Sequence, residues 1–147
     1  MIDSAKSGLF SSKQALIPKW PKWGVFGSVI AILILTVLEF PAPIGFETRP
    51  QNNVSHLWLV LFLAILVTEI VTLLLIFKRP QVGMKFGVTA GALNILQVYA
   101  DQAHLMQPQV APLGYSLLEG AVALVSLVLI YFAWKVHKSV QDRGLTP

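Results

Sequence analysis

The chain has 147 residues, of which 55% are hydrophobic and only 12% are charged. A soluble domain carries about 25% charged residues, so this composition excludes an ordinary soluble domain and favours a membrane protein. The net charge of +4 does not indicate binding to nucleic acid, because the basic residues flank apolar segments. The absence of cysteine excludes disulfides, thiolate metal sites and c-type haem attachment.

Four apolar stretches predict an all-α membrane protein, an antiparallel bundle of four transmembrane helices. Each stretch is close to the roughly 20 residues that a helix needs to cross a bilayer core. They cover residues 23–40, 56–77, 82–106 and 113–136. Short connections make consecutive helices antiparallel neighbours. The prediction therefore divides the chain into a leader that can lie on the membrane surface (1–22), a transmembrane domain (23–136) and a tail (137–147).

The basic residues indicate how the bundle is oriented. With four spans both termini lie on one side of the membrane, and ten of the eleven Lys and Arg residues fall on that side, with Arg49 on the other. Basic loops stay in the cytoplasm, so we expect cytoplasmic termini in a plasma membrane or a bacterial inner membrane. The bilayer is the expected partner, and the outer helix faces leave room for other membrane subunits or a homo-oligomer.

Small and polar side chains share one face of the third stretch. At 100° per residue they fall within a sector of about 140°, and they are Gly83, Gly87, Ala90, Gly91, Asn94, Gln97, Asp101 and His104. Glycines four residues apart let helix backbones approach closely, so Gly83, Gly87 and Gly91 predict a packing surface. The sequence leaves open whether this surface meets the same chain or a partner. The polar half predicts a pocket that opens to the outside.

Acidic side chains on the other helices are expected at matching depths. Glu119 reaches about the depth of Asp101, and the two are expected to share a cavity. Glu69 lies deeper, level with Asn94; in a purely structural role the protonated acid would donate a hydrogen bond toward Asn94. An ionisable residue inside a membrane is costly and is a functional candidate by default.

These positions predict one polar site. Glu39 and His56 lie at the outer ends of their helices and are expected at the outer rim of the pocket. The predicted ligand or proton pathway consists of Glu69, Asn94, Gln97, Asp101, His104 and Glu119. The first interpretation is a non-enzymatic pocket that binds or conducts a small ligand, ion or proton, alone or as an accessory subunit of a larger membrane complex.

Metal or haem binding is a second interpretation of the same residues. Asp101 and His104 have the acid-x-x-His spacing of carboxylate metal bundles, and Glu119 is a third candidate ligand. The second such pair that this chemistry needs is missing from the sequence. His56 and His104 lie at similar depth and could ligate a haem. No cofactor is firmly implied.

A membrane-embedded enzyme is the remaining interpretation. Paired acids can move a proton on a lipid or quinone substrate by acid/base chemistry. In architecture and length alone, the chain is similar to small four-helix membrane isomerases of the sterol type. That similarity implies a lipid-sized cavity and transfers no site residue.

Overall fold

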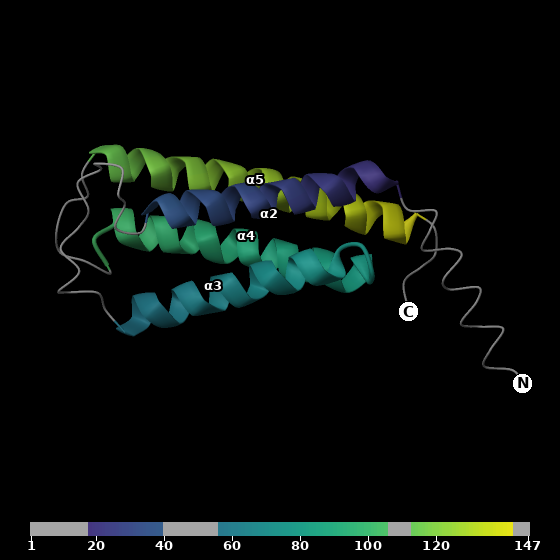
Figure 1. Cartoon of the computed structure of the whole chain (residues 1–147), viewed down its shortest axis with the longest axis horizontal. Helices are drawn as coiled ribbons and strands as arrows, with labels where there is room; N and C mark the ends of the chain where they lie inside the picture. Colours follow the sequence, from purple (N-terminus) through teal and green to yellow (C-terminus); the bar gives the residue numbers. More distant parts are fainter. Residues whose placement is uncertain (1–17, 40–55, 106–112, 143–147) are drawn as a thin grey trace, which may run out of the picture.

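The computed structural model describes residues 18–39, 56–105 and 113–142, and Figure 1 shows its architecture. Within these residues the fold is all-helical, with the helices α2 (Lys19–Glu39), α3 (His56–Leu75), α4 (Pro80–Gln102) and α5 (Leu113–Gln141). Consecutive helices run in opposite directions (Figure 1). The predicted four-helix, all-α fold is therefore confirmed for the described residues. The predicted leader as far as residue 17 and the tail from residue 143 lie outside them.

The helices differ from the predicted stretches at their ends. α2 begins at Lys19, inside the predicted leader, and Pro21 lies in its first turn, where a missing N–H breaks no helical hydrogen bond. α4 begins at Pro80 for the same reason. α5 continues to Gln141, five residues beyond the predicted end. No proline or glycine interrupts the chain there, and Val140 is still buried in the core.

α4 ends at Gln102, four residues before the predicted end. The backbone N–H of Leu105 donates to the carbonyl of Ala100 at 2.9 Å, and that of His104 donates to the carbonyl of Asp101 at 3.0 Å. This pair of bonds is a Schellman motif, which requires a residue in the left-handed region. His104 occupies that position with a φ of 56°. The chain therefore leaves the helical path before His104.

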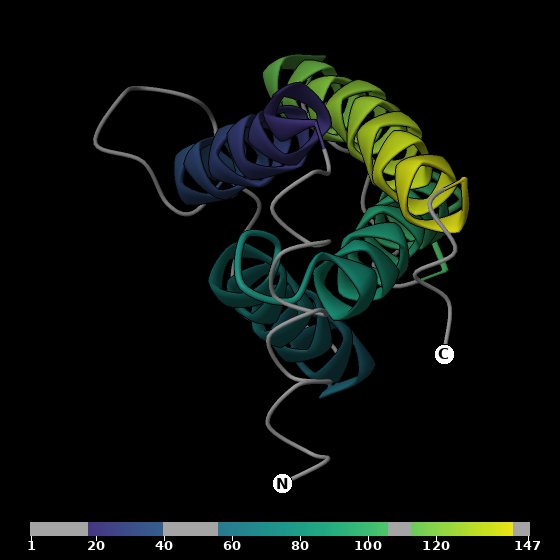
Figure 2. The same cartoon turned by 90° about the vertical axis from the view of Figure 1, so that its right-hand side faces the viewer.

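The hydrophobic core lies mainly between α2, α4 and α5. Viewed along the bundle, the helices follow one another in the order α2, α5, α4 and α3 (Figure 2). α3 packs chiefly against α4, and its packing against α2 is slight. The buried apolar side chains of the core are Val25, Val29, Ile32, Ile76, Met84, Ala90, Val122, Leu129, Ala133, Val136 and Val140.

The glycine face of α4 packs inside the chain. A Cβ added to Gly83 would lie 2.6 Å from the backbone nitrogen of Ile76, in the turn after α3. A Cβ added to Gly91 would lie 3.0 Å from the carbonyl oxygen of Ser126 on α5. At Gly87 the nearest contact is an ordinary 3.4 Å. The small residues therefore bring α4 close to both α3 and α5, as glycine faces do in membrane bundles.

The outer surface of the bundle is rich in exposed aliphatic side chains. α2 over Lys19–Leu38 and α5 over Leu113–Gln141 are long and apolar enough to cross a membrane. Only 33% and 28% of their most apolar windows are buried inside the structure, whereas a core helix of a soluble protein would be mostly buried. Val37, Val60, Leu74 and Leu124 are each at least 60% exposed. Apolar surface of this extent indicates contact with lipid or protein.

The basic residues of the described chain gather toward one end of the bundle. At that end α2 begins, α3 passes into α4, and α5 finishes (Figure 1). We call this the basic end, and its residues are Lys19, Lys22, Lys78, Arg79, Lys85, Lys135 and Lys138. Buried polar side chains occur along the bundle, from Lys22 and Ser28 toward this end to Asp101 and Glu119 toward the other.

Candidate functional site

A carboxylic acid lies on the buried face of α3. The inward side chains of this helix are Ile65, Glu69 and Thr72, which follow the three-to-four-residue spacing of a single helical face. Glu69 is only 1% exposed. The hydroxyl of Thr72 donates to the carbonyl of Thr68 within the same helix at 2.7 Å. The threonine is therefore satisfied locally, and Glu69 is the group that reaches toward α4.

Glu69 and Asn94 form the expected contact between α3 and α4. The Nδ2 atom of Asn94 donates to Oε1 of Glu69 at 2.9 Å and to the carbonyl oxygen of Ala90 at 3.1 Å. The direction differs from the one expected of a purely structural, protonated Glu69, because the amide rather than the acid is the donor. An amide N–H can donate to the carboxyl group whether that group is charged or neutral. The pair therefore allows Glu69 to change its protonation state without losing this bond.

A second pair joins α4 to α5 further from the basic end. Glu119 is 4% exposed, and its Oε2 atom accepts a hydrogen bond from Nε2 of Gln102. The same Nε2 lies 3.3 Å from the hydroxyl of Ser116. The sequence analysis did not include Gln102 in the polar site, although this residue lies between Asp101 and His104 in the chain. Its position is about 80° from Asn94 on a helical projection, at the edge of the polar sector.

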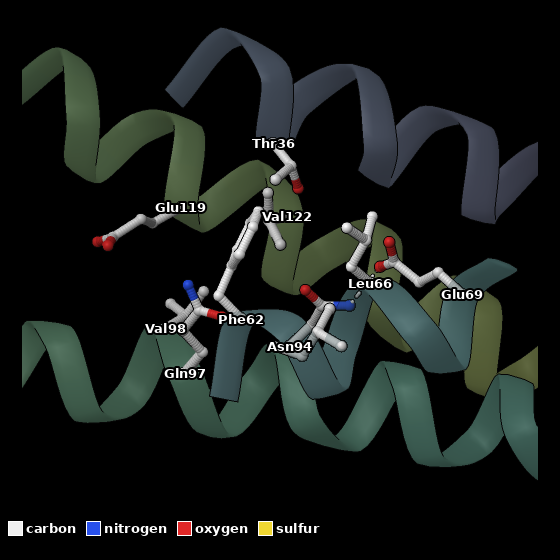
Figure 3. Close-up of a pocket in the computed structure, with 10 residues that line it drawn as sticks. Thr36, Phe62, Leu66, Glu69, Asn94, Gln97, Val98, Glu119 and Val122 are labelled. Carbon is white, nitrogen blue, oxygen red and sulfur yellow. Dashed lines mark hydrogen bonds between the residues drawn. The ribbon is translucent and has the colours of Figure 1, made fainter. Parts of the chain in front are cut away.

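Glu69 and Asn94 of the first pair and Glu119 of the second line one small cavity (Figure 3). All four helices contribute to it, with the lining residues Thr36, Phe62, Ile65, Leu66, Glu69, Asn94, Gln97, Val98, Glu119 and Val122. Gln97 is half-buried and lies between the two pairs along α4. Asn94 and Gln102 are eight residues apart, about 12 Å along the helix. The cavity therefore connects polar groups at two depths of the bundle.

Water is the natural occupant of a cavity of this size. The volume of the cavity that is open to the centre of a water molecule is about 20 Å³. Roughly 10–15 Å³ measured in this way suffices for one water, provided that polar partners line the space. Glu69, Gln97 and Glu119 supply such partners. Small-molecule pockets generally measure about 300–1,000 Å³, so a lipid or quinone does not fit this cavity.

Other residues of the predicted pathway lie apart from the cavity. Asp101 is 1% exposed, close to the end of α4, but it is not among the lining residues. His104 is exposed, because the Schellman motif ends α4 before it. The expectation that His104 shares the polar face is therefore not met. Glu39 ends α2 and His56 begins α3, and the side chains of both lie outside the described part of the chain.

The charged groups that line the cavity are both acids. Glu69 and Glu119 face it, whereas the described lysines and arginines lie toward the basic end. Within residues 18–39, 56–105 and 113–142, no three His, Asp or Glu side chains gather as a metal site requires. The arrangement can hold water and a proton or small cation, and its charge disfavours an anion. Comparison of the chain with known protein families, curated proteins and solved structures finds no match.

Proposed function

We propose that this chain is an integral membrane protein of four spans that carries protons through its polar cavity. Both termini face the cytoplasm, in a plasma membrane or a bacterial inner membrane. Glu119 exchanges protons nearer the outer surface, and Glu69 holds the inner position. Water beside Gln97 carries the proton between them. The proposal selects the proton from the wider class of small ligands and ions that the sequence allows.

Several features support the membrane placement. α2 and α5 have the length and apolarity of spans, and the outward side chains of α3 and α4 include exposed Leu63, Val67, Ile70, Val88 and Leu96. Glu69, Asn94 and Asp101 of these two helices are buried instead, as intramembrane polar groups are. The basic end corresponds to the cytoplasmic side by the positive-inside rule.

The observation that carries the function is the Glu69–Asn94 pair in a water-sized cavity. A charged group this deep in a membrane costs a few kcal/mol. If Glu69 were only structural, an amide at this position would pack equally well without that cost. A purely structural role therefore does not explain why the residue is an acid. A carboxyl group can accept and release a proton, which an amide cannot do at neutral pH. Glu119, the second acid that lines the cavity, can exchange this proton with Glu69.

Proton flux into vesicles tests this function directly. The purified protein is placed in liposomes that contain a pH-sensitive dye, and a potassium gradient with valinomycin supplies the driving voltage. We expect the wild type to acidify the vesicles faster than protein-free liposomes. Glu69→Gln should fold normally, because the glutamine oxygen still accepts the Asn94 bond. Its flux should fall at least tenfold, because proton transfer by a side chain typically contributes 10²–10⁴-fold.

Asp142→Asn is the matched control, since it removes a carboxylate from an exposed position at the end of α5. Its flux should equal that of the wild type. A Glu69→Gln variant that conducts normally would refute the pathway. Reporter fusions within residues 41–55 and at residue 147 test the topology separately. A cytoplasmic signal from residues 41–55 would refute the four-span orientation.

A further inference from the structure

A second concave site lies between α4 and α5, away from the polar cavity. It is an open groove of about 390 Å³, lined by Met84, Lys85, Val88, Ile130, Ala133, Trp134 and His137. The buried side chains of Met84 and Ala133 form its floor. Its volume lies within the range of small-molecule sites, roughly 300–1,000 Å³. The groove is therefore large enough for part of an aliphatic chain, unlike the cavity that contains Glu69.

The rim of this groove is basic and aromatic. Lys85 and His137 are exposed at its edge. The Nζ atoms of Lys135 and Lys138 lie 5.7 Å and 5.9 Å from the ring centroid of Trp134. Cations at such distances are attracted to the face of an indole ring. The groove thus combines an apolar trough with ammonium groups at the basic end of the bundle.

We propose that this groove, named here the α4/α5 groove, binds an anionic phospholipid. One acyl chain lies in the trough beside Val88, and the phosphate is held by Lys85, which lines the groove, and by Lys138, which lies beside Trp134. Tryptophan and lysine concentrate at the level of lipid headgroups, and basic pockets between spans on the cytoplasmic side hold anionic headgroups. The proposal depends on the membrane placement above. It does not depend on proton transfer.

Lipid binding to the full-length protein in neutral detergent provides the test. Native mass spectrometry measures the dissociation constants of dioleoyl phosphatidylglycerol and dioleoyl phosphatidylcholine, which differ only in headgroup. We expect one tight phosphatidylglycerol site and affinity for phosphatidylcholine at least tenfold weaker. Lys85→Gln and Lys138→Gln should each weaken phosphatidylglycerol binding roughly fivefold, from the contribution of one lysine near an anionic surface.

Lys78→Gln is the matched control, because Lys78 is exposed at the same end of the bundle but lies outside the groove. It should leave the affinity unchanged. Val88→Phe fills the trough without changing the charge and should weaken binding of both lipids. Circular dichroism checks that each variant is folded. If Val88→Phe does not fold, the two lysine variants alone test the proposal.

Three results would overturn the proposal. Equal affinity for the two lipids would show that the rim does not recognise a headgroup charge. Equal loss in Lys78→Gln and Lys85→Gln would show that general charge, not this groove, attracts the lipid. Displacement of phosphatidylglycerol by millimolar glycerol 3-phosphate would identify a phosphate site that needs no acyl chain. Each result leaves the proton assay unaffected, so this proposal and the proposed function fail separately.

Discussion

Replacing the glycines of α4 one at a time by alanine tests how closely this helix packs against its neighbours. The three sites differ in what a new methyl group would meet. At Gly87 it makes ordinary contacts, the nearest at 3.4 Å. At Gly91 it lies 2.7 Å from the side chain of Ile130 and 3.0 Å from the backbone of Ser126. At Gly83 it lies 2.6–2.9 Å from backbone atoms of Leu75 and Ile76, where α3 ends.

The expected free energies follow from these contacts. Alanine stabilises a helix interior by about 0.5–1 kcal/mol relative to glycine, so Gly87→Ala should raise the free energy of unfolding by that amount. Overpacking costs about 1–3 kcal/mol. Ile130 can rotate but the Ser126 carbonyl cannot, so Gly91→Ala should have a net cost of about 1 kcal/mol. Only backbone opposes Gly83→Ala, and its net cost should be about 2 kcal/mol.

Unfolding in mixed detergent micelles by increasing dodecyl sulfate, followed by far-UV circular dichroism, measures these differences. The ranking from most to least stable should be Gly87→Ala, wild type, Gly91→Ala and Gly83→Ala. The opposite sign at Gly87 makes the test strict, because a general intolerance of larger side chains would destabilise all three variants. A Gly87→Ala variant as unstable as Gly91→Ala would refute the packing described for α4.

Three further predictions concern the polar groups. Asn94→Leu removes the donor to Glu69 and should lower the free energy of unfolding by about 1–3 kcal/mol, the cost of an unsatisfied buried group; an unchanged value would mean that the pair contributes nothing to stability. Gln102→Leu should act on Glu119 in the same way but less strongly, because Gln102 is exposed; a larger effect than that of Asn94→Leu would contradict the burial order. His104→Gly should raise stability by about 0.5–1 kcal/mol, because glycine adopts the left-handed region without strain, and it should leave proton flux unchanged; a loss of flux would return His104 to the pathway.

The fold was predictable because its signal is repeated along the chain. Four long apolar stretches separated by short polar segments allow few arrangements other than antiparallel helices. The inward face of α4 was also predictable, because Gly83, Gly91 and Asn94 share one side of a helical projection. All three are buried in the structure. A helix rises 1.5 Å per residue, and this rise predicted that Glu69 and Asn94 lie at the same depth. In the structure the two side chains form a hydrogen bond.

The parts of the site that were not predicted depend on the backbone or side-chain conformation of single residues. His104 leaves the polar face because the chain turns left-handed there, a position usually signalled by glycine. Gln102 reaches Glu119 from the edge of the sector, because its long side chain bends toward α5. Asp101 is buried as expected, but a helical projection cannot tell a side chain that lines a cavity from one packed beside it.

The pairing of α2 with α5 affects the order in which the molecule can be assembled. α2 buries Val25, Val29 and Ile32, and it packs chiefly against α5, which is synthesised after the three other described helices. Chains are synthesised from the N-terminus at about 5–20 residues per second. α3 and α4 can therefore pair as a hairpin before α5, the main packing partner of α2, has been synthesised. A premature stop before α5 would leave the buried face of α2 uncovered and present it to the cell's quality-control proteases.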